Sequence, residues 1–559
     1  MELLESRRLT GPNLISDRPG PVLDVLCSAE EAERLIPVWK EQVARMHIAL
    51  GWQEPLFAWR GLRGGVSLAF TAPTDALYTA SEINDWAWLS SAHQLGEDVE
   101  LPDFDDAQNA LRARAAEEVN PKLMRLIDEA KSRGKTLLWD DDEVSVGLGT
   151  GSMSWPVRAI PDEVRWEKIH DVPVGLVTGT NGKTTTVRLA AHIVRMAGKN
   201  VGLSSTDWVA VNERIIDRGD WSGPGGARTV LRQQDVDLAI LESARGGLLR
   251  RGLGVDHADT ALITNIAEDH LGDFGSRSLG ELLDIKWIVS RAVRESGKLI
   301  LNADDALLRQ KARDYDGEVV WFGLDPDNAQ ITEATANGDL CFVLDGDELQ
   351  KVQRGKRERI CDSRDIPITL GGVARHNVAN ALAAAALCYC LGLSVDAIAA
   401  GLMTMDQGGN PGRCNIYEVG GVKVLVDFAH NPAAMRSVLN MARAIPAQRR
   451  VLCFGQAGDR PDELIRAMTR DAWAIGLDKA IVSELAGYYR GREKGVVYSI
   501  IRDELLRCGA QPSQIEHHAE ELDSFTAAMT WAKPGDLVIM LALGGLAPIQ
   551  ERLRELGAE

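Results

Sequence analysis

The spacing of apolar residues changes along the chain and predicts two successive α/β regions after a mixed N-terminal part. In residues 1 to about 165, segments 30–46 and 117–132 repeat apolar side chains with a helical period, and 66–72 has the pattern of a strand. From residue 172 onward, short apolar runs alternate with amphipathic ones. The predicted strands are 172–179, 237–243, 260–265, 298–302 and 318–322, and helices are predicted at 184–198 and 278–293.

A second alternating series follows the glycine-rich turn at 408–414. Its predicted strands are 423–429, 449–455, 479–483 and 536–541, with helices beginning at Pro432 and Pro461. Alternation of this kind predicts parallel sheets with helices on both faces. The expected fold class is therefore α/β, with an N-terminal α+β domain at 1–165, a central parallel-sheet domain at 166–411 and a C-terminal Rossmann-like domain at 412–559.

Composition narrows the range of partners. The formal net charge of −19 argues against broad binding to nucleic acid or to an anionic membrane, but it leaves room for a small basic pocket. No apolar run has the length of a membrane span, and the first residues lack the apolar core of a signal peptide. The eight cysteines include no CxxC pair, and we expect Cys388 and Cys390 to be buried thiols in a helix. We therefore expect a cytoplasmic protein.

The strongest chemical signal is the sequence TGTNGKTT at 178–185, between a predicted strand and a predicted helix. Small residues let backbone N–H groups point at a phosphate, and the helix N-terminus adds positive potential. Lys183 is placed to neutralise phosphate charge, and the Thr184 hydroxyl to bind Mg²⁺. The strict GxxxxGK[ST] pattern is not met, because Val177 stands six residues before Lys183. We interpret the segment as the P-loop-type site of an ATPase domain; a tight turn without a ligand is the alternative.

Two further residues are candidate magnesium ligands. Glu242 ends an apolar strand, and His270 follows the next predicted strand. Open α/β sheets place their ligand sites at this edge, where Thr184 is also expected. Oxygen ligands suit Mg²⁺. Taken singly, Glu242 is also compatible with a solvated acid at a strand end, and His270 with a loop histidine.

Six motifs in order resemble those of the Mur ligase family. They are TGTNGKTT, the strand-end Glu242, NIAEDHLG, HNVANALAAAAL at 376–387, PGRCN at 411–415 and DFAHNP at 427–432. Within that family, LESARGGLLRRGLG at 241–254 and AGDRPDELI at 457–465 are similar to the Mur-like half of cyanophycin synthetases. The opening LTGPN at 9–13 resembles the N-terminal domain of the same enzymes. Segment 134–151 resembles only the beginning of their ATP-grasp half, so the chain looks like such an enzyme without that half.

The resemblance implies a role for each matching position. The triphosphate is expected at Gly179, Thr180, Asn181, Gly182, Lys183, Thr184 and Thr185. The other nucleotide contacts are expected from Asn377, Asn380, Arg413 and Asp427, and the magnesium ligands are Thr184, Glu242 and His270. The catalytic set is Lys183, Glu242, His270, Lys286 and Arg413. The expected substrate-facing residues are Asp207, Arg245, His430, Asp459, Arg460, Arg490 and Arg492.

Lys286 occupies the position at which many Mur ligases have a carbamylated lysine that supports a second metal ion. A surface ion pair with Asp284 or Glu281 is the alternative for this residue.

Some positions depart from the family pattern. Trp208 and Trp221 stand where smaller or polar residues are usual, which predicts a narrower acceptor site. The segment 483–495 lacks an acidic run before its RGR element and has only Glu484 there, although a shift of the alignment by a few residues would bring in Glu493. A guanidinium needs a carboxylate partner, so we expect an incoming amine other than free arginine. Arg490 and Arg492 are candidates for gripping a carboxylate, and an exposed loop charge pair is the alternative.

The resemblance implies an ATP-dependent ligase that joins a carboxylate to an amine through an acyl phosphate. We expect ATP and Mg²⁺ as cofactors and an amino acid or short peptide as substrate. We expect neither a nucleic acid nor a membrane as partner. A homo-oligomer and a separate ATP-grasp enzyme of the same pathway stay open as partners. The competing hypothesis is a non-catalytic nucleotide-binding partner or regulator of such an ATP-grasp ligase.

Overall fold

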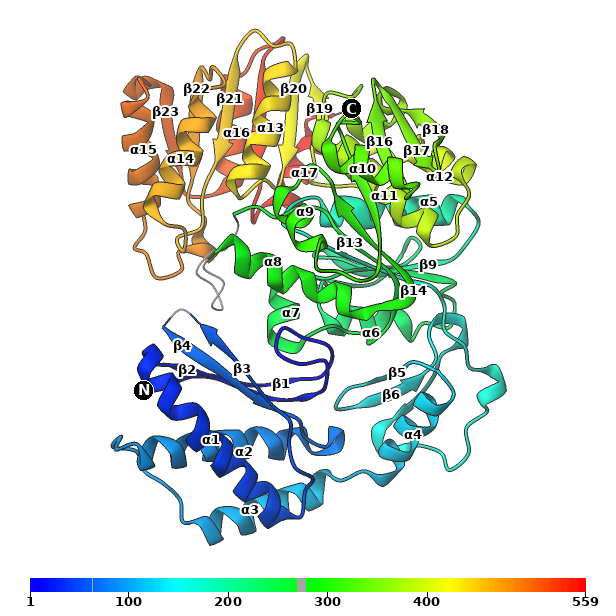
Figure 1. Cartoon of the computed structure of the whole chain (residues 1–559). Coiled ribbons are helices and arrows are strands. Elements are labelled where there is room, and N and C mark those ends of the chain that lie inside the picture. Colours follow the sequence, from blue (N-terminus) through cyan, green and yellow to red (C-terminus); the bar gives the residue numbers. More distant parts are fainter. Residues whose placement is uncertain (63, 269–277, 559) are drawn as a thin grey trace.

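A computed structural model describes residues 1–62, 64–268 and 278–558 (Figure 1). Its N-terminal part is an antiparallel sheet with helices on one face. The sheet has the order β1 (Glu2–Leu9), β2 (Gly20–Leu26), β4 (Gly65–Phe70), β3 (Phe57–Leu62). Helices α1 (Ala29–Leu50), α2 (Leu77–Gln94) and α3 (Phe104–Glu118) pack together around the buried Trp39. The α+β prediction for this part is confirmed.

The predicted helix at 117–132 is wrong in its first residues. The chain forms α3, then leaves the helix at Val119 and begins α4 (Pro121–Ser132). Pro121 lacks an N–H group and disfavours a helical residue before it, so it starts a new helix. The Asn120 side chain caps that helix by accepting from the Leu123 N–H at 3.0 Å.

A small antiparallel sheet connects this part to the centre of the molecule. It consists of β5 (Leu137–Trp139), β6 (Glu143–Val146) and β7 (Met153–Pro156). The Arg232 guanidinium donates to Asp140 at 2.7 Å and to the Glu143 carboxylate at 3.0 Å. Segment 134–156 is therefore fastened to the central α/β layers.

The central sheet has eleven strands in the order β11-β10-β9-β12-β8-β13-β14-β15-β16-β17-β18. The parallel strands are β8 (Val174–Thr178), β9 (Val201–Ser204), β12 (Leu238–Glu242), β13 (Ala258–Ile263), β14 (Val293–Asn302), β15 (Glu318–Gly323) and β16 (Cys341–Asp345). Antiparallel strands extend both edges: β10 (Trp208–Val211), β11 (Arg214–Arg218), β17 (Glu348–Gln353) and β18 (Lys356–Asp362). The parallel core confirms the predicted parallel sheet, whereas β9, β16 and the antiparallel edge strands were not predicted.

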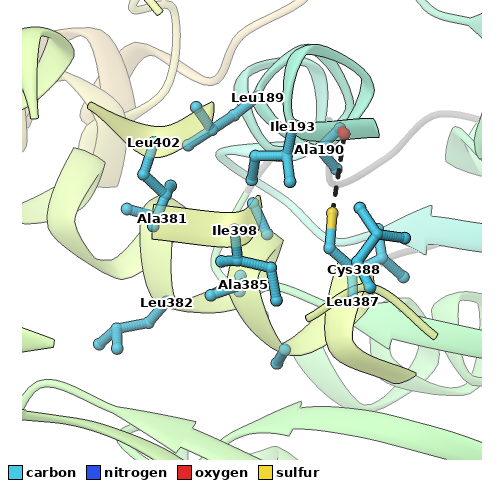
Figure 2. Close-up of a cluster of buried hydrophobic side chains, with 14 of the residues drawn as sticks. Leu189, Ala190, Ile193, Ala381, Leu382, Ala385, Leu387, Cys388, Ile398 and Leu402 are labelled. Atoms are coloured by element: carbon cyan, nitrogen blue, oxygen red, sulfur yellow. Dashed lines mark hydrogen bonds between the residues drawn. The ribbon is translucent and has the colours of Figure 1, made fainter. Parts of the chain in front are cut away.

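Helices cover both faces of this sheet. On one face α5 (Lys183–Met196), α11 (Arg375–Cys390) and α12 (Val395–Leu402) share a core of small and branched side chains (Figure 2). The other face carries α6 (Pro224–Leu231), α7 (Arg245–Arg251), α8 (Leu279–Trp287), α9 (Ala306–Ala312) and α10 (Ala329–Asn337). Cys388 is buried, as expected, and its thiol donates to the Ala190 carbonyl at 3.6 Å. Cys390, by contrast, is only partly buried.

The C-terminal part is a six-stranded sheet in the order β19-β20-β24-β21-β22-β23. Its strands are β19 (Asn415–Val419), β20 (Val422–Asp427), β21 (Arg450–Phe454), β22 (Lys479–Ser483), β23 (Ile515–His518) and β24 (Leu537–Leu541), and only β19 is antiparallel. Helices α13 (Pro432–Ala444), α14 (Asp462–Trp473) and α15 (Val496–Arg507) cover one face, and α16 (Glu521–Trp531) and α17 (Leu546–Glu555) the other. The Rossmann-like prediction is confirmed; the domain boundaries at 165/166 and 411/412 stay predictions.

No helix in the described ranges combines the length and the apolar character that crossing a membrane requires.

Candidate active site

The loop between β8 and α5 is held by two glycines that no other residue can replace without strain. Gly179 has a φ of 143° and Gly182 a φ of 85°, both in the region that favours glycine. A Cβ atom on Gly179 would lie 1.8 Å from the Thr264 hydroxyl, and one on Gly182 would lie 2.2 Å from the Asn380 side-chain oxygen. The loop is therefore packed tightly between β13 and α11. The loop and the first turn of α5 line a cleft.

This cleft has a volume of about 380 Å³ and lies between the central and C-terminal sheets. Ten of the eleven expected nucleotide-binding residues line it: Thr180, Asn181, Gly182, Lys183, Thr184, Thr185, Asn377, Asn380, Arg413 and Asp427. The Lys183 ammonium donates to the Thr180 carbonyl at 3.0 Å, so it is folded over the loop. We call this cleft the nucleotide cavity.

A hydroxyl and a buried carboxylate meet at the end of β12. The Thr184 hydroxyl donates to Glu242 Oε2 at 3.0 Å. Within the described part of the chain, Glu242 Oε1 is buried and has no hydrogen-bond partner. Burial raises the pKa of the Glu242 carboxyl above its ordinary value, and the Lys183 charge opposes this shift. An unsatisfied buried carboxylate oxygen beside a hydroxyl fits a hard cation such as Mg²⁺.

His270, the third expected magnesium ligand, lies outside the described residues. Within the residues that are described, no group of three or more His, Cys, Asp or Glu side chains is arranged to hold a metal ion.

Lys286 reaches the same loop from α8. It is only 3% exposed, and its ammonium donates to the Gly179 carbonyl at 2.6 Å. Asp284, one partner expected for a surface ion pair, binds Lys311 at 2.9 Å instead. The alternative of a surface ion pair for Lys286 is therefore wrong, because the side chain points inward to the phosphate loop.

A second cavity of about 480 Å³ adjoins the first. The two share Thr180, Lys183, Thr206, Arg413, Phe428 and His430. Six of the seven expected substrate-facing residues line it: Asp207, Arg245, His430, Asp459, Arg460 and Arg490. Lys183 and Arg413 thus lie where the nucleotide cavity meets a second compartment, which we call the acceptor cavity.

Two family models match the regions that build these cavities. One, described as the Mur ligase middle domain, matches residues 177–388, and one described as Mur ligase, glutamate ligase domain matches residues 412–544. Together they match more than half of the chain. The chain belongs to the Mur ligase family.

Individual relatives agree with this assignment. Cyanophycin synthetase of Crocosphaera subtropica is 35% identical over 373 residues, which are 66% of this chain and 42% of that enzyme. Cyanophycin synthetase of Synechocystis sp. is 36% identical over 338 residues, which are 60% of this chain and 38% of that enzyme. The chain spans less than half the length of these curated relatives. FolC of E. coli, solved with ADP, shares the fold, with a TM-score of 0.51 at 19% identity over 68% of this chain and 89% of that chain.

Arg492 does not line the acceptor cavity of this Mur ligase, unlike its neighbour Arg490. Its guanidinium donates to the Gly458 and Arg460 carbonyls, each at 2.6 Å, and to Asp462 at 2.7 Å. It therefore fixes the loop that carries Arg460. Arg490 is 49% exposed and lies 3.9 Å from Asp459.

The expectation of an amine other than free arginine stays a prediction, because the acceptor cavity has carboxylates that do not come from segment 483–495. Glu484, the acid that precedes the RGR element, lies 3.2 Å from His517 and does not line the cavity. The fold instead brings three carboxylates to the acceptor cavity from other segments: Asp207, Asp220 and Asp459. A cationic substrate group therefore has partners that no local pattern in 483–495 indicates.

The expected narrowing by two tryptophans is also wrong. Trp208 packs under the Arg188 guanidinium at 4.0 Å, and Trp221 lines a separate groove next to α6. Neither ring lines the acceptor cavity.

Sequence reasoning missed two contacts beside the nucleotide cavity, one of which joins the domains of this Mur ligase. The side-chain amides of Asn181 and Asn431 pair reciprocally, at 2.8 and 3.3 Å, and so connect the phosphate loop to the start of α13. The Phe428 ring packs against the Arg413 guanidinium at 4.5 Å. Both Phe428 and Asn431 belong to the motif DFAHNP, which was the available signal.

Proposed function

We propose that this Mur ligase uses ATP to join a carboxylate to an amine. The observation that carries the proposal is the meeting of two cavities at Lys183 and Arg413, with the phosphate loop on one side and charged side chains on the other. The family assignment supports it, because the relatives are synthetases or ligases by name. What is said below about the acceptor, the amine and any partner enzyme is part of this proposal.

In the reaction proposed, an acceptor carboxylate oxygen attacks the γ-phosphorus of ATP. The bond between that phosphorus and the β–γ bridging oxygen breaks, ADP leaves with the electron pair, and an acyl phosphate remains. The amine nitrogen then attacks the acyl carbon, the C–O bond to phosphate breaks, and the nitrogen loses a proton. The products are an amide, ADP and inorganic phosphate.

Each step has a matching group in the chain. Lys183 is placed to neutralise charge on the transferred phosphoryl group, and Arg413 to face it from the C-terminal domain. Thr184 and Glu242 are the residues that would hold Mg²⁺, which supplies further positive charge at the phosphates. The enclosing domains exclude water, which would otherwise hydrolyse the acyl phosphate.

The surroundings of the acceptor cavity suit a small peptide as well as an amino acid. A groove of about 780 Å³ adjoins it between β1 and the α6–α7 region, and both hollows are lined by Asp220, Ala244 and Gly246. The groove is lined by Arg7, Arg8, Arg228, Arg250 and Arg251. Arginines bind carboxylates well, so this groove supports an acceptor with more than one carboxylate.

The experiment is a substrate panel. Purified protein receives ATP, Mg²⁺, one acceptor and one amine, the acceptors being aspartate, glutamate and short acidic peptides and the amines including arginine, lysine and glutamate. The proposal predicts ADP release that requires both substrates, with a product mass equal to their sum minus water. Nucleotide binding without any product across the panel would instead favour a non-catalytic partner.

A further inference from the structure

Arg188 is a buried arginine of α5 that lines neither the nucleotide cavity nor the acceptor cavity. It stands five residues after Lys183, and its side chain is only 2% exposed. Burial lowers the pKa of the Arg188 guanidinium to about 10, so it is still charged at neutral pH. A buried charge needs good partners, because desolvation is costly.

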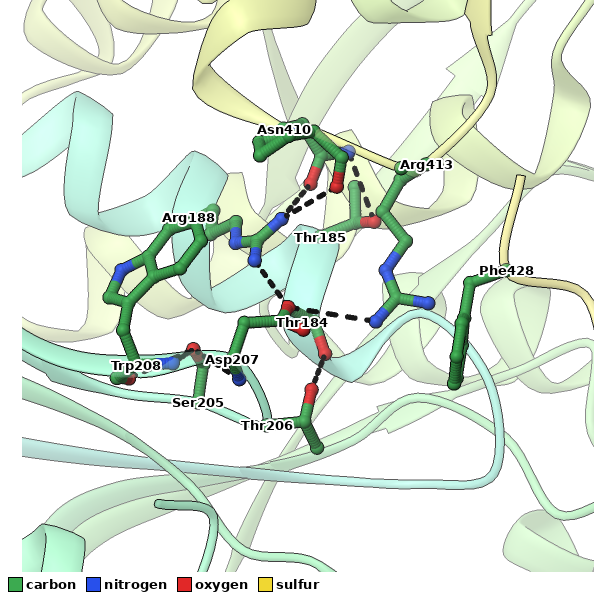
Figure 3. A network of polar contacts seen from close by, with 12 residues as sticks. Thr184, Thr185, Arg188, Ser205, Thr206, Asp207, Trp208, Asn410, Arg413 and Phe428 are labelled. Atoms are coloured by element: carbon green, nitrogen blue, oxygen red, sulfur yellow. Dashed lines mark hydrogen bonds and ion pairs between the residues drawn. The ribbon is translucent and has the colours of Figure 1, made fainter. Parts of the chain in front are cut away.

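The guanidinium has partners on two sides (Figure 3). One nitrogen forms an ion pair with the Asp207 carboxylate, and another donates to the Asn410 side-chain oxygen and the Pro411 carbonyl, both at 3.3 Å. The Trp208 ring lies against its face at 4.0 Å. Arg188 therefore links the loop after β9 to the segment that connects the central and C-terminal domains.

Both of these connections lead to Arg413. The carboxylate oxygen of Asp207 that pairs with Arg188 also lies 3.8 Å from an Arg413 nitrogen. Asn410, only three residues before Arg413, is buried and donates to the Thr185 hydroxyl at 3.2 Å. Arg413 is thus fixed through a shared carboxylate and through its own backbone.

The location of Arg413 explains why fixing it matters. It lines both cavities, and its guanidinium lies between Asp207 and the Phe428 ring (Figure 3). Two guanidinium groups share one carboxylate there. Without Arg188, Asp207 is free to draw Arg413 fully toward itself and away from the junction of the cavities.

We propose that Arg188 is a positioning residue that holds Arg413, through Asp207 and the segment 410–411, at the place where the reacting groups meet. The consequence for catalysis rests on the ligase function proposed above. Arg188 acts through other residues and touches no reactant.

The test compares Arg188→Met, Arg188→Lys and Asp207→Asn with the wild-type protein. We expect Arg188→Met and Asp207→Asn each to lower kcat by about tenfold or more. The dissociation constant for ATP is expected to change less than kcat, because the phosphate loop supplies most nucleotide contacts. Arg188→Lys is expected to recover only part of the rate, since an ammonium cannot bridge both sides in the manner of a planar guanidinium.

Two measurements separate positioning from mere stability. The first is kcat of the double variant that combines Arg188→Met with Asp207→Asn. If Arg188 acts through Asp207, this kcat is no lower than that of the slower single variant. Arg449→Met is the matched control: Arg449 pairs with the buried Asp536 at 2.5 Å and packs on Trp531 at 4.0 Å, within the C-terminal domain. The Arg449→Met variant is expected to have a lower melting temperature than the wild-type protein and an unchanged kcat.

Wild-type kcat in soluble Arg188→Met, or in Asp207→Asn if the first variant does not fold, overturns the proposal. A double variant whose loss of kcat equals the product of the two single losses overturns the proposal as well. A crystal structure of Arg188→Met gives a readout that needs no turnover: Arg413 is expected to move toward Asp207 and away from the Phe428 ring, and an unmoved Arg413 contradicts the proposal. Absence of ligation by the wild-type protein counts against the ligase function alone.

Discussion

Thr184 and Glu242 are 58 positions apart in sequence, yet one hydrogen bond joins them beneath the phosphate loop. Both were predicted as magnesium ligands, because Glu242 ends an apolar strand and Thr184 follows the phosphate loop at the same edge of the sheet, where α/β sheets gather ligand groups. Of the groups around the two cavities, Asp207 and Asp459 were expected from the family resemblance, whereas Asp220 and Asn431 were not predicted. They come from separate segments, and only the folded chain brings them together.

Replacing Lys183 by alanine is expected to abolish ligation. The Lys183 ammonium is the cation of the phosphate loop and lines both cavities. The measurement is product formation by mass, with Lys199→Ala, an exposed lysine beyond α5, as control. A rate for Lys183→Ala within about tenfold of wild type contradicts the catalytic assignment of this loop.

Replacing Glu242 by glutamine is expected to stabilise the ligand-free protein while it lowers activity. Burial raises the Glu242 pKa, so ionisation costs folding free energy at any pH above the ordinary carboxyl value. The contribution of Glu242 to folding stability is therefore present at low pH and is lost as pH rises through the raised pKa. Glutamine does not ionise, so the variant keeps its stability at neutral pH.

The measurement for Glu242→Gln is the melting temperature as a function of pH, with and without Mg²⁺ and ATP. The variant is expected to melt higher than wild type at neutral pH and to differ less in acid. Its rate is expected to drop by about 100-fold, since a ligand charge is lost. An unchanged rate with unchanged magnesium dependence would place the metal elsewhere.

At the scale of helices and strands, the fold depends on close approach of helices beneath the phosphate loop. In Figure 2, α5, α11 and α12 meet through residues such as Ala190, Ala385 and Ile398. Gly401 of α12 lies so close to α5 that a Cβ atom there would be 2.6 Å from the Ile193 Cα. Small residues at this crossing therefore set the position of the helix that carries Lys183 and Arg188.

Gly401→Ala is expected to destabilise the protein even though alanine favours helices by about 1 kcal/mol. The added methyl group meets backbone, and overpacking of this kind costs about 1–3 kcal/mol. Gly280→Ala in α8 is the control, because the nearest atom there is 3.9 Å away. Chemical denaturation measures both. A Gly401→Ala variant as stable as wild type would show that the crossing of α12 and α5 has room for the added methyl group.

In the central sheet, patterns of apolar residues predicted β8, β12, β13, β14 and β15 but missed the short buried strands β9 and β16 and the antiparallel strands at the edges. The parallel strands are covered on both faces, so they appear as continuous apolar runs. Strands β11 and β18 are mostly exposed, and their polar sequences RIIDR and KRERICD give no such run. Edge strands exist because a neighbour pairs with them, which a local pattern does not record.

For the whole molecule, the decisive feature is that the nucleotide cavity lies between two domains. The central part supplies the phosphate loop, and the C-terminal part supplies Arg413, Asp427 and Phe428. The paired amides of Asn181 and Asn431 join the two parts directly. The placement of the two parts relative to each other depends on such long-range contacts. The sequence therefore predicted an α/β fold for each part but not the contact between Asn181 and Asn431.

Asn431→Asp is expected to weaken ATP binding by about tenfold or more, because a carboxylate replaces an amide beside the phosphate loop and repels the triphosphate. Aspartate keeps the helix cap, in which Asn431 accepts from the Ala434 N–H at 3.0 Å. Calorimetric titration with ATP measures the effect. Asn328→Asp, at the cap of α10 away from the cleft, is the control. Equal affinity for Asn431→Asp and wild type argues against a nucleotide in this cleft.

The central claim is that a carboxylate is activated by the γ-phosphate of ATP, and oxygen tracing tests it most directly. The acceptor selected by the substrate panel is labelled with ¹⁸O in its carboxylate and converted with ATP and the amine, and the inorganic phosphate is then analysed by mass. The account predicts one ¹⁸O atom in each phosphate released during amide formation, and none with Lys183→Ala, which releases no phosphate by this route. Amide formation that leaves the phosphate unlabelled would contradict it.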